Sequence, residues 1–167
     1  YRDLDTLRRF AAGCDVVTFD HEHVPTAHLE ALEDDGTAVH PRPAALVHAQ
    51  DKLVMRERLT AAGIPCPRWR AVSGADDVAA FAREVGWPVV LKTPRGGYDG
   101  KGVWLLDGPA AAEEVLAGLA ASGGAAAQVP WLAEEAVPFR RELAAVVARS
   151  PHGQAVAYPC VETVQVD

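Results

Sequence analysis

The feature that most constrains this chain is a glycine-rich loop between two short apolar runs, residues 89–91 and 103–106. The loop contains the sequence Gly96-Gly97-Tyr98-Asp99-Gly100-Lys101-Gly102. Both flanking runs are rich in Val and Leu, which predicts a pair of antiparallel strands. The connection is too long for a two-residue hairpin turn. The sequence therefore predicts a strand–loop–strand hairpin whose connection has a role beyond reversing the chain.

The composition of this loop is typical of an anion-binding site. It holds four glycines, and Lys92, Arg95 and Lys101 add three cations. Glycines expose backbone N–H groups and permit positive φ, and successive free N–H groups form an anion-binding nest. A Walker loop would need Ser or Thr after the lysine and a helix behind it, but Gly102 and a strand-like run follow Lys101. The pattern favours a lid over a polyphosphate, with a ligand-free surface hairpin as the alternative.

Composition limits the class of protein. Of 167 residues, 49% are hydrophobic and 23% charged, with a formal charge of −7, which argues against nucleic acid as the main partner. No apolar run reaches the roughly 20 residues that span a bilayer. Cys14, Cys66 and Cys160 form neither a metal pair nor a disulfide framework, so we expect reduced thiols in a cytoplasm.

The first part of the chain reads as an α/β unit. Helices are predicted over residues 4–12, 27–33, 44–49 and 52–62, with short strands over residues 16–19 and 37–40. Thr26 is the expected cap of the second helix, and Gly63 ends the fourth. Lys52, at the start of that helix, reads by itself as a solvated lysine. The first helix lacks a preceding strand and residues 162–167 stop in strand-like sequence, so we expect a piece of a longer protein.

A small α+β layer is predicted next. Strands are expected over residues 69–72, 89–92 and 103–106, with helices over residues 76–85, capped by Ser73, and 109–120 covering one face of an antiparallel sheet. Glu134 and Glu135 end an apolar segment that Pro138 interrupts, which suggests a hinge between lobes. A strand over residues 142–149, apolar at nearly every position, predicts a sheet buried on both faces, followed by a turn at residues 150–153.

Asp20, His21, Glu22 and His23 follow the first predicted strand. Ligands of open α/β sheets lie beyond the carboxyl ends of strands, so this polar loop is placed for substrate. Zinc sites usually need three or four convergent ligands, and only this local cluster is visible. We therefore favour a substrate loop over a metal site and expect no bound transition metal.

Several motifs recur in the order and spacing of a known family. They are Asp51-Lys52, Lys92 at its strand end, the glycine loop, Glu134-Glu135-Ala136-Val137-Pro138-Phe139, Arg141-Glu142-Leu143 and Tyr158-Pro159. With residues 18–25 included, nearly the whole chain resembles the carboxyaminoimidazole ribonucleotide synthetases of bacterial purine synthesis, a branch of the ATP-grasp family. This resemblance implies a partial ATP-grasp fold of α/β and α+β class. The expected parts are the end of an α/β domain at residues 1–50, a linker helix at 51–65, a central subdomain at 66–137 and the start of a C-terminal lobe at 138–167.

The resemblance also implies an activity. Members phosphorylate bicarbonate with ATP to carboxyphosphate, and the amine of aminoimidazole ribonucleotide captures the carboxyl group. It implies a cytoplasmic homodimeric ligase without nucleic-acid or membrane partners, using Mg²⁺ whose ligands are expected outside these residues. The isolated piece is expected to be inactive. Another ATP-grasp ligase, such as a biotin-dependent carboxylase subunit, and a non-catalytic nucleotide-binding module remain alternatives.

The family pattern assigns site residues by position. Lys101, Tyr98 and Asp99 would be catalytic. The nucleotide would be bound by Lys52, Lys92, Gly97, Tyr98, Asp99, Gly100, Lys101, Gly102, Val103, Glu134, Glu135, Ala136, Val137, Glu142 and Gln165. The chain departs from the pattern at three positions: the family usually has an aromatic residue at His21, Asn at His23 and often His at Gln165.

Overall fold

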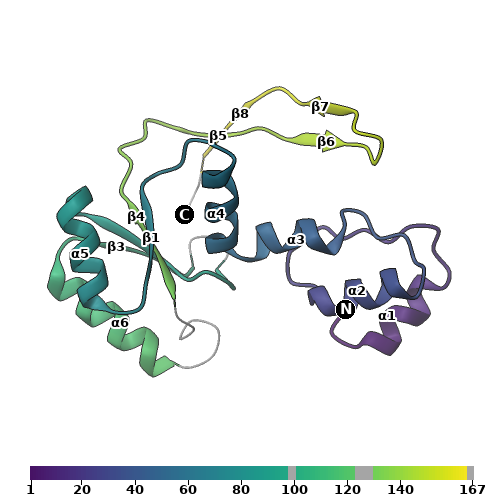
Figure 1. Ribbon diagram of the computed structural model, residues 1–167, viewed down its shortest axis with the longest axis horizontal. Coiled ribbons are helices and arrows are strands. Elements are labelled where there is room, and N and C mark those ends of the chain that lie inside the picture. The colour runs from purple at the N-terminus through teal and green to yellow at the C-terminus, as the bar shows by residue number, and fades with distance from the viewer. Residues whose placement is uncertain (98–100, 123–129, 165–167) are drawn as a thin grey trace. The chain divides into compact units, whose positions relative to one another are not determined.

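The computed structural model describes residues 1–97, 101–122 and 130–164 (Figure 1). The chain divides into two compact units, Tyr1–Ala136 and Val137–Asp167. Four predicted site residues, Tyr98, Asp99, Gly100 and Gln165, lie outside the described residues. No helix in the described ranges is long and apolar enough to cross a membrane.

The first unit opens with helices around a small apolar core. They are α1 (Leu4–Ala11), α2 (Thr26–Asp34), α3 (Pro43–Gln50) and α4 (Lys52–Ala61), and the core includes Leu29, Leu32 and Val39. The helices match the predicted ones. The two predicted strands, however, are reduced to one parallel bridge between Val17 and Val39, closed by two hydrogen bonds. A parallel pair this short is marginal without further strands beside it, and none pairs with it in the described part of the chain.

Both predicted helix caps are wrong, because Pro25 and Gly74 stand at the N-cap positions of the two helices. Helix α2 begins at Thr26 itself, whose hydroxyl donates to Gln50 Oε1 at 2.8 Å. Helix α5 (Ala75–Val85) begins two residues after Ser73, whose backbone N–H donates to Asp77 Oδ2 at 2.8 Å. The hydroxyl that the sequence assigned to a helix end is therefore not at the cap position in either case.

A four-stranded antiparallel sheet forms the centre of the first unit. Its order is β1 (Trp69–Val72), β4 (Trp131–Glu135), β2 (Val89–Lys92) and β3 (Val103–Leu106). The hairpin predicted around the glycine loop is confirmed, with Val89 opposite Leu106 and Lys92 opposite Val103. The glycine loop therefore connects two neighbouring strands at one end of the sheet.

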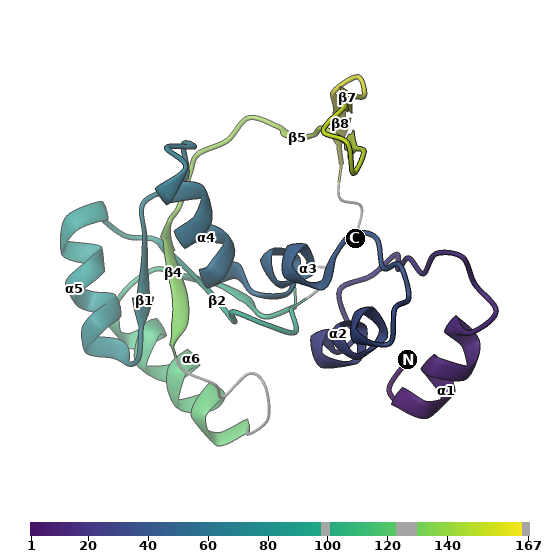
Figure 2. The same cartoon turned by 45° about the vertical axis from the view of Figure 1, so that its right-hand side comes forward.

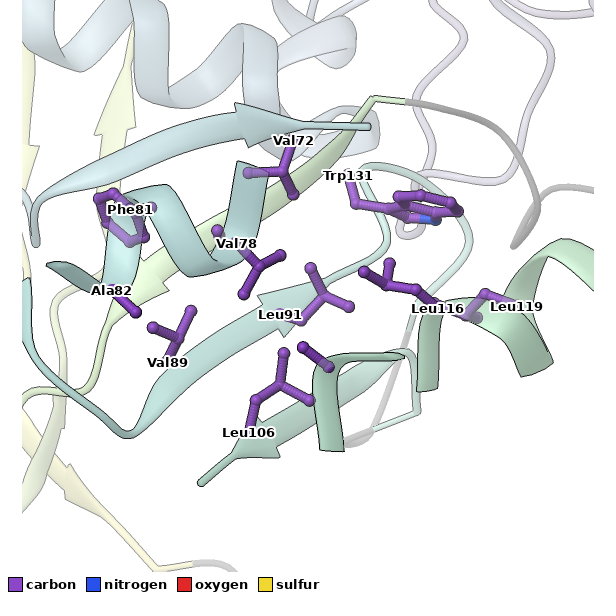
Figure 3. Close-up of a cluster of buried hydrophobic side chains, with 12 residues drawn as sticks. Val72, Val78, Phe81, Ala82, Val89, Leu91, Leu106, Leu116, Leu119 and Trp131 are labelled. Carbon is purple, nitrogen blue, oxygen red and sulfur yellow. The ribbon is translucent and has the colours of Figure 1, made fainter. Parts of the chain in front are cut away.

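Helices α5 and α6 (Pro109–Ser122) pack on one face of this sheet, as predicted, and α4 lies on the other side (Figure 2). The core between helices and sheet contains Val78 and Phe81 of α5 and Leu116 of α6, set against strand residues such as Leu91 (Figure 3). Each fully buried side chain of this size contributes roughly 1.5–3 kcal/mol. The alternation of a strand leaves every second side chain, Lys92 among them, for the opposite face.

The second unit consists of two short ladders, in which β5 (Glu142–Ala144) pairs with β8 (Val161–Thr163) and β6 (Val147–Arg149) with β7 (Ala155–Ala157). The predicted turn is confirmed by the hydrogen bond from Ser150 N to Gln154 O, at 2.8 Å. The single strand predicted over residues 142–149 is broken, and its burial on both faces is wrong. Its apolar side chains are exposed because no described residue of this unit forms a layer over the ladders.

Candidate functional site

The two ends of the glycine loop lie close together beside Thr93. The Thr93 side chain is buried and its N–H donates to Gly102 O at 2.9 Å. A Cβ on Gly102 would lie 2.5 Å from Thr93 Oγ1, and Gly102 has φ of +76°. A Cβ on Gly97 would lie 2.6 Å from Lys101 O. Only glycine therefore fits at these two positions, which form the narrow base of the loop.

The start of α4 is joined to the entrance of this loop. Lys52 N–H donates to Pro94 O at 2.9 Å, and Arg95 Nε donates to Asp51 Oδ2 at 2.8 Å. The other oxygen of Asp51 accepts hydrogen bonds from the N–H groups of Leu53 and Val54 and so caps the helix. One carboxylate thus orders both the first turn of α4 and the entrance to the loop.

This junction gives Lys52 an environment unlike that of a solvated lysine. The side chain is half-buried, and its ammonium nitrogen lies 3.6 Å from the position of a Cβ on Gly97. Burial lowers the pKa of Lys52, and the positive charge of Lys92 lowers it further. Two cations that repel one another in a partly buried site would be stabilised by an anion.

Lys92 belongs to a buried ionic triad with Glu134 and Arg56. Its ammonium lies 2.5 Å from Glu134 Oε2, and the Nε of Arg56 donates to Glu134 Oε1. The Glu134 side chain is only 3% exposed. Burial by itself raises the pKa of Glu134, but the hydrogen bonds from Arg56 and Lys92 outweigh it and hold the pKa below its usual value. Glu134 therefore stays ionised at neutral pH.

The sequence interpretation missed Arg56 altogether. The sequence feature that could have identified it is its spacing from Lys52: Arg56 stands four residues later, one turn further along the same helix. The spacing alone does not identify its partner, because Glu134 is 78 residues away.

The neighbouring carboxylate, Glu135, is held in a different way. It accepts hydrogen bonds from Arg68 N at 2.9 Å and Arg68 Nε at 2.7 Å. These two interactions lower the pKa of Glu135. Consecutive strand residues point to opposite faces, so Glu134 faces α4 and Glu135 binds the chain entering β1. The side chains of Glu134 and Glu135, both predicted to bind the nucleotide, therefore have different partners and do not form one cluster.

Other predicted site residues within the described ranges lie at the boundary between the two units or at the start of a strand. Ala136 ends the first unit and Val137 begins the second. Val103 opens β3 and Glu142 opens β5, and both residues are exposed. The structure brings Lys52, Lys92, Gly97, Gly102 and Glu134 together through the contacts above.

The polar loop at residues 20–25 is held by Gln50. Gln50 Nε2 donates to both Glu22 O and Val24 O at 2.9 Å. A cavity of about 130 Å³ is lined by Glu22, His23, Gln50, Arg95 and Gly96. The loop predicted to face substrate therefore meets the glycine loop. The anchoring role of Gln50 was not predicted, since a lone Gln at a helix end carries no such signal.

The two histidines of this loop interact with each other. The rings of His21 and His23 lie 5.4 Å apart, and His23 N donates to His21 Nδ1 at 3.1 Å. The edge of His21 also contacts Tyr1, with ring centroids 5.1 Å apart. Another cavity, of about 270 Å³, lies beside Phe19, Asp20 and His21.

Two further observations bound the site. A cavity of about 380 Å³ near Cys66 and Trp69 contains none of the predicted site residues. Within residues 1–97, 101–122 and 130–164, no three His, Cys, Asp or Glu side chains are grouped so that they could hold a metal ion.

Comparison with known proteins covers the whole chain. Residues 57–167 match the family model described as ATP-grasp domain, and residues 1–50 match the ribonucleotide synthetase preATP-grasp domain. The N5-carboxyaminoimidazole ribonucleotide synthase of Mycobacterium tuberculosis H37Rv is 53% identical over 100% of this chain and 38% of its own length. That of Synechococcus elongatus is 39% identical over 98% of this chain and 40% of its own length. The chain thus spans about two fifths of the length of these curated relatives.

Solved structures agree with these matches. The carboxyaminoimidazole ribonucleotide synthase of Aspergillus clavatus in complex with ATP has a TM-score of 0.84 and 30% identity, over 99% of this chain and 42% of that one. The A. clavatus enzyme with ADP and 5-aminoimidazole ribonucleotide gives 0.81 and 28%, over 99% and 41%. A biotin carboxylase domain from Hydrogenobacter thermophilus, at 16% identity and 0.82 over 95% and 37%, shares the fold.

Proposed function

The chain belongs to the ATP-grasp family, and we propose that it forms the ATP-binding part of an enzyme that carboxylates 5-aminoimidazole ribonucleotide. In the proposed reaction a bicarbonate oxygen attacks the γ-phosphorus of ATP and ADP leaves. The substrate amine then attacks the carboxyl carbon of carboxyphosphate, a C–N bond forms, the C–O bond to phosphate breaks and the amine loses a proton. The names of the curated relatives and the ligands of the A. clavatus complexes support this assignment.

The main observation behind the proposal is that Lys52 and Lys92 lie beside the narrow base of the glycine loop. The two lysines repel one another, and Lys52 is partly desolvated. A triphosphate would relieve that repulsion and accept hydrogen bonds from loop N–H groups. Phosphoryl transfer depends mainly on such positioning and charge stabilisation.

The remaining roles follow the family pattern. Gly97, Tyr98, Asp99, Gly100, Lys101, Gly102 and Val103 would cover the phosphates, with Lys101, Tyr98 and Asp99 nearest the reacting groups. Residues 134–137 would hold adenine through backbone groups, because the Glu134 and Glu135 side chains are engaged by Arg56, Lys92 and Arg68. Glu142 would accept hydrogen bonds from the ribose hydroxyls, and Gln165 would donate to phosphate.

The loop of Glu22 and His23 would face the second substrate, because it shares a cavity with Arg95 and Gly96 of the glycine loop. Mg²⁺ enters no step above, and no three His, Cys, Asp or Glu side chains of the described residues are grouped to hold it. Following the family, we further propose a cytoplasmic, homodimeric enzyme of purine synthesis.

The test of the activity is ADP release by a full-length protein that carries this sequence. We expect release to require both bicarbonate and aminoimidazole ribonucleotide. ADP release that is stimulated by biotin, or that does not depend on bicarbonate, would contradict the proposed function.

The nucleotide contacts are tested by two variants on α4. Lys52→Met should raise KM for ATP roughly tenfold or more, because a hydrogen bond to a charged group contributes about 1.5–3 kcal/mol. Arg58→Met, an exposed position on the same helix, is the matched control and should leave KM unchanged. Equal effects of the two substitutions would contradict the site.

The ribose contact is tested separately with Glu142→Ala. The wild type should bind ATP more tightly than its 2′,3′-dideoxy analogue, and the variant should lose that preference. A wild type that does not distinguish the two nucleotides would show that Glu142 is wrongly assigned.

A further inference from the structure

The triad of Arg56, Glu134 and Lys92 contains one more positive charge than negative. Glu134 is almost fully buried, while the Arg56 and Lys92 side chains are 16% and 24% exposed. Arg56 occupies Oε1 of the carboxylate and Lys92 occupies Oε2. Each oxygen of the Glu134 carboxylate is therefore paired with a different cation, so Lys92 does not have to bind both oxygens.

The consequence for Lys92 follows from counting charges. Paired with Lys92 alone, Glu134 would neutralise it, and a buried pair of that kind exerts little attraction on an approaching phosphate. With Arg56 present the cluster keeps a net charge of about +1. The ammonium of Lys92 has three N–H donors, and one directed at Glu134 leaves others for a ligand.

We propose that Arg56 is a positioning residue for ATP binding: it holds Glu134 from the α4 side and so keeps the charge of Lys92 available to the phosphates. The inference rests on the proposed function, since it takes ATP as the anion that Lys92 meets. Without Arg56, Glu134 Oε1 loses its partner in a buried site, and the carboxylate competes with phosphate for Lys92. Arg56 itself need not contact the nucleotide.

The first test uses Arg56→Met, Arg56→Gln and Arg56→Lys in a full-length protein carrying this sequence. Binding of a non-hydrolysable ATP analogue is measured by calorimetry, with circular dichroism as the check on folding. We expect the two neutral variants to bind about 10- to 30-fold more weakly, a loss near 1.4–2 kcal/mol. Arg56→Lys should recover affinity to within about threefold, because it restores the charge. Steady-state kinetics should show the loss mainly in KM for ATP and less in kcat.

The second test removes the carboxylate that Arg56 holds. In a Glu134→Gln background, Arg56→Met should weaken binding by less than about threefold, because no negative charge remains to capture Lys92. A role in folding alone would lower the melting temperature of these variants without this non-additivity and without rescue by lysine.

The third test is the pH dependence of the loss. The charged groups that face Glu134 are Arg56 from α4 and Lys92 from β2, with Lys52 beside Lys92. In Arg56→Met, burial is opposed by Lys92 alone, so the pKa of Glu134 rises and protonation at lower pH releases Lys92. The ratio of variant to wild-type dissociation constants should therefore fall as the pH is lowered.

The outcomes separate this inference from the proposed function. If the wild type does not bind the analogue, the proposed function fails. If the wild type binds and the neutral variants bind equally well, or if the losses of Arg56→Met and Glu134→Gln add fully, the positioning role of Arg56 is overturned. Should Arg56→Met not fold, Arg56→Gln and the pH ratio measured on it decide the same question.

Discussion

The two faces of the central sheet are built for different purposes. On the face beneath α5 and α6, Leu91 is buried among apolar neighbours (Figure 3), and Ala133 belongs to the same core. On the face toward α4, the very next residues, Lys92 and Glu134, form an ionic triad with Arg56. A shift of one residue along a strand exchanges the two environments. Substitutions on the first face should therefore reduce stability, and those on the second should affect nucleotide handling as well.

The largest expected effect is on the helix-covered face. Leu91 is fully buried, so Leu91→Ala should lower the free energy of unfolding by about 3 kcal/mol through lost burial and a residual cavity. Leu105→Ala is the matched control on β3, where the side chain is 60% exposed, and should cost less than about 1 kcal/mol. Urea unfolding measures both, and similar losses would show that the two faces are not distinct.

The next largest effect tests the glycine loop, whose lysine should act during the reaction. In a full-length protein, Lys101→Ala should lower kcat about a hundredfold, near 2.7 kcal/mol, with a much smaller change in KM for ATP. Lys101→Arg keeps the charge and should retain more activity. An ATP analogue with Mg²⁺ should also slow tryptic cleavage after Lys101. A fully active Lys101→Ala protein, together with a wild type cleaved equally with and without nucleotide, would reduce the hairpin to a ligand-free surface feature.

A third comparison sets Glu134→Gln against Glu135→Gln. At pH 7, Glu134→Gln should lower the free energy of unfolding by about 2 kcal/mol, because it weakens a buried, hydrogen-bonded triad. Glu135→Gln should lower it less, because the partner of Glu135, Arg68, is exposed.

The pH dependence of these variants has a definite sign. Both carboxyl groups have a lowered pKa in the folded protein. Each carboxylate therefore stabilises the fold at pH values above its ordinary pKa of 4.5. That stabilisation is lost as pH falls through the lowered pKa. The difference between the wild type and Glu134→Gln should therefore shrink as the pH falls below 4.5, and a difference independent of pH would contradict an ionised Glu134.

The smallest expected effect concerns the base of the glycine loop. Gly102→Ala should cost about 1.5 kcal/mol, because its positive φ and the 2.5 Å approach to Thr93 Oγ1 both oppose a side chain. Gly108→Ala, with nothing within 4 Å of its Cβ position, should change stability by less than about 0.5 kcal/mol. Thermal unfolding of the two variants distinguishes them. Equal melting temperatures would mean that the loop base adjusts to a side chain.

Local patterns predicted much of the fold. The helices of the first unit, the antiparallel hairpin around the glycine loop and the two helices on one face of the sheet all follow from periodicity and from glycine positions. The errors arose where a local preference was overridden by a distant partner, as with Thr26, whose hydroxyl binds Gln50. The strand predicted at residues 142–149 failed for a related reason: its burial depended on a covering layer that its own pattern cannot supply.

By itself, the sequence determined which residues could carry charge to a phosphate and where the backbone must be glycine, since both depend on residue type and near neighbours. Only the tertiary structure decided the partners. Arg56 meets Glu134 across 78 residues, Arg95 meets Asp51 across 44, and Glu135 binds Arg68 rather than joining its neighbour. An ionic contact is set by the distance between two side chains in the folded chain, and no periodicity in the sequence encodes that distance.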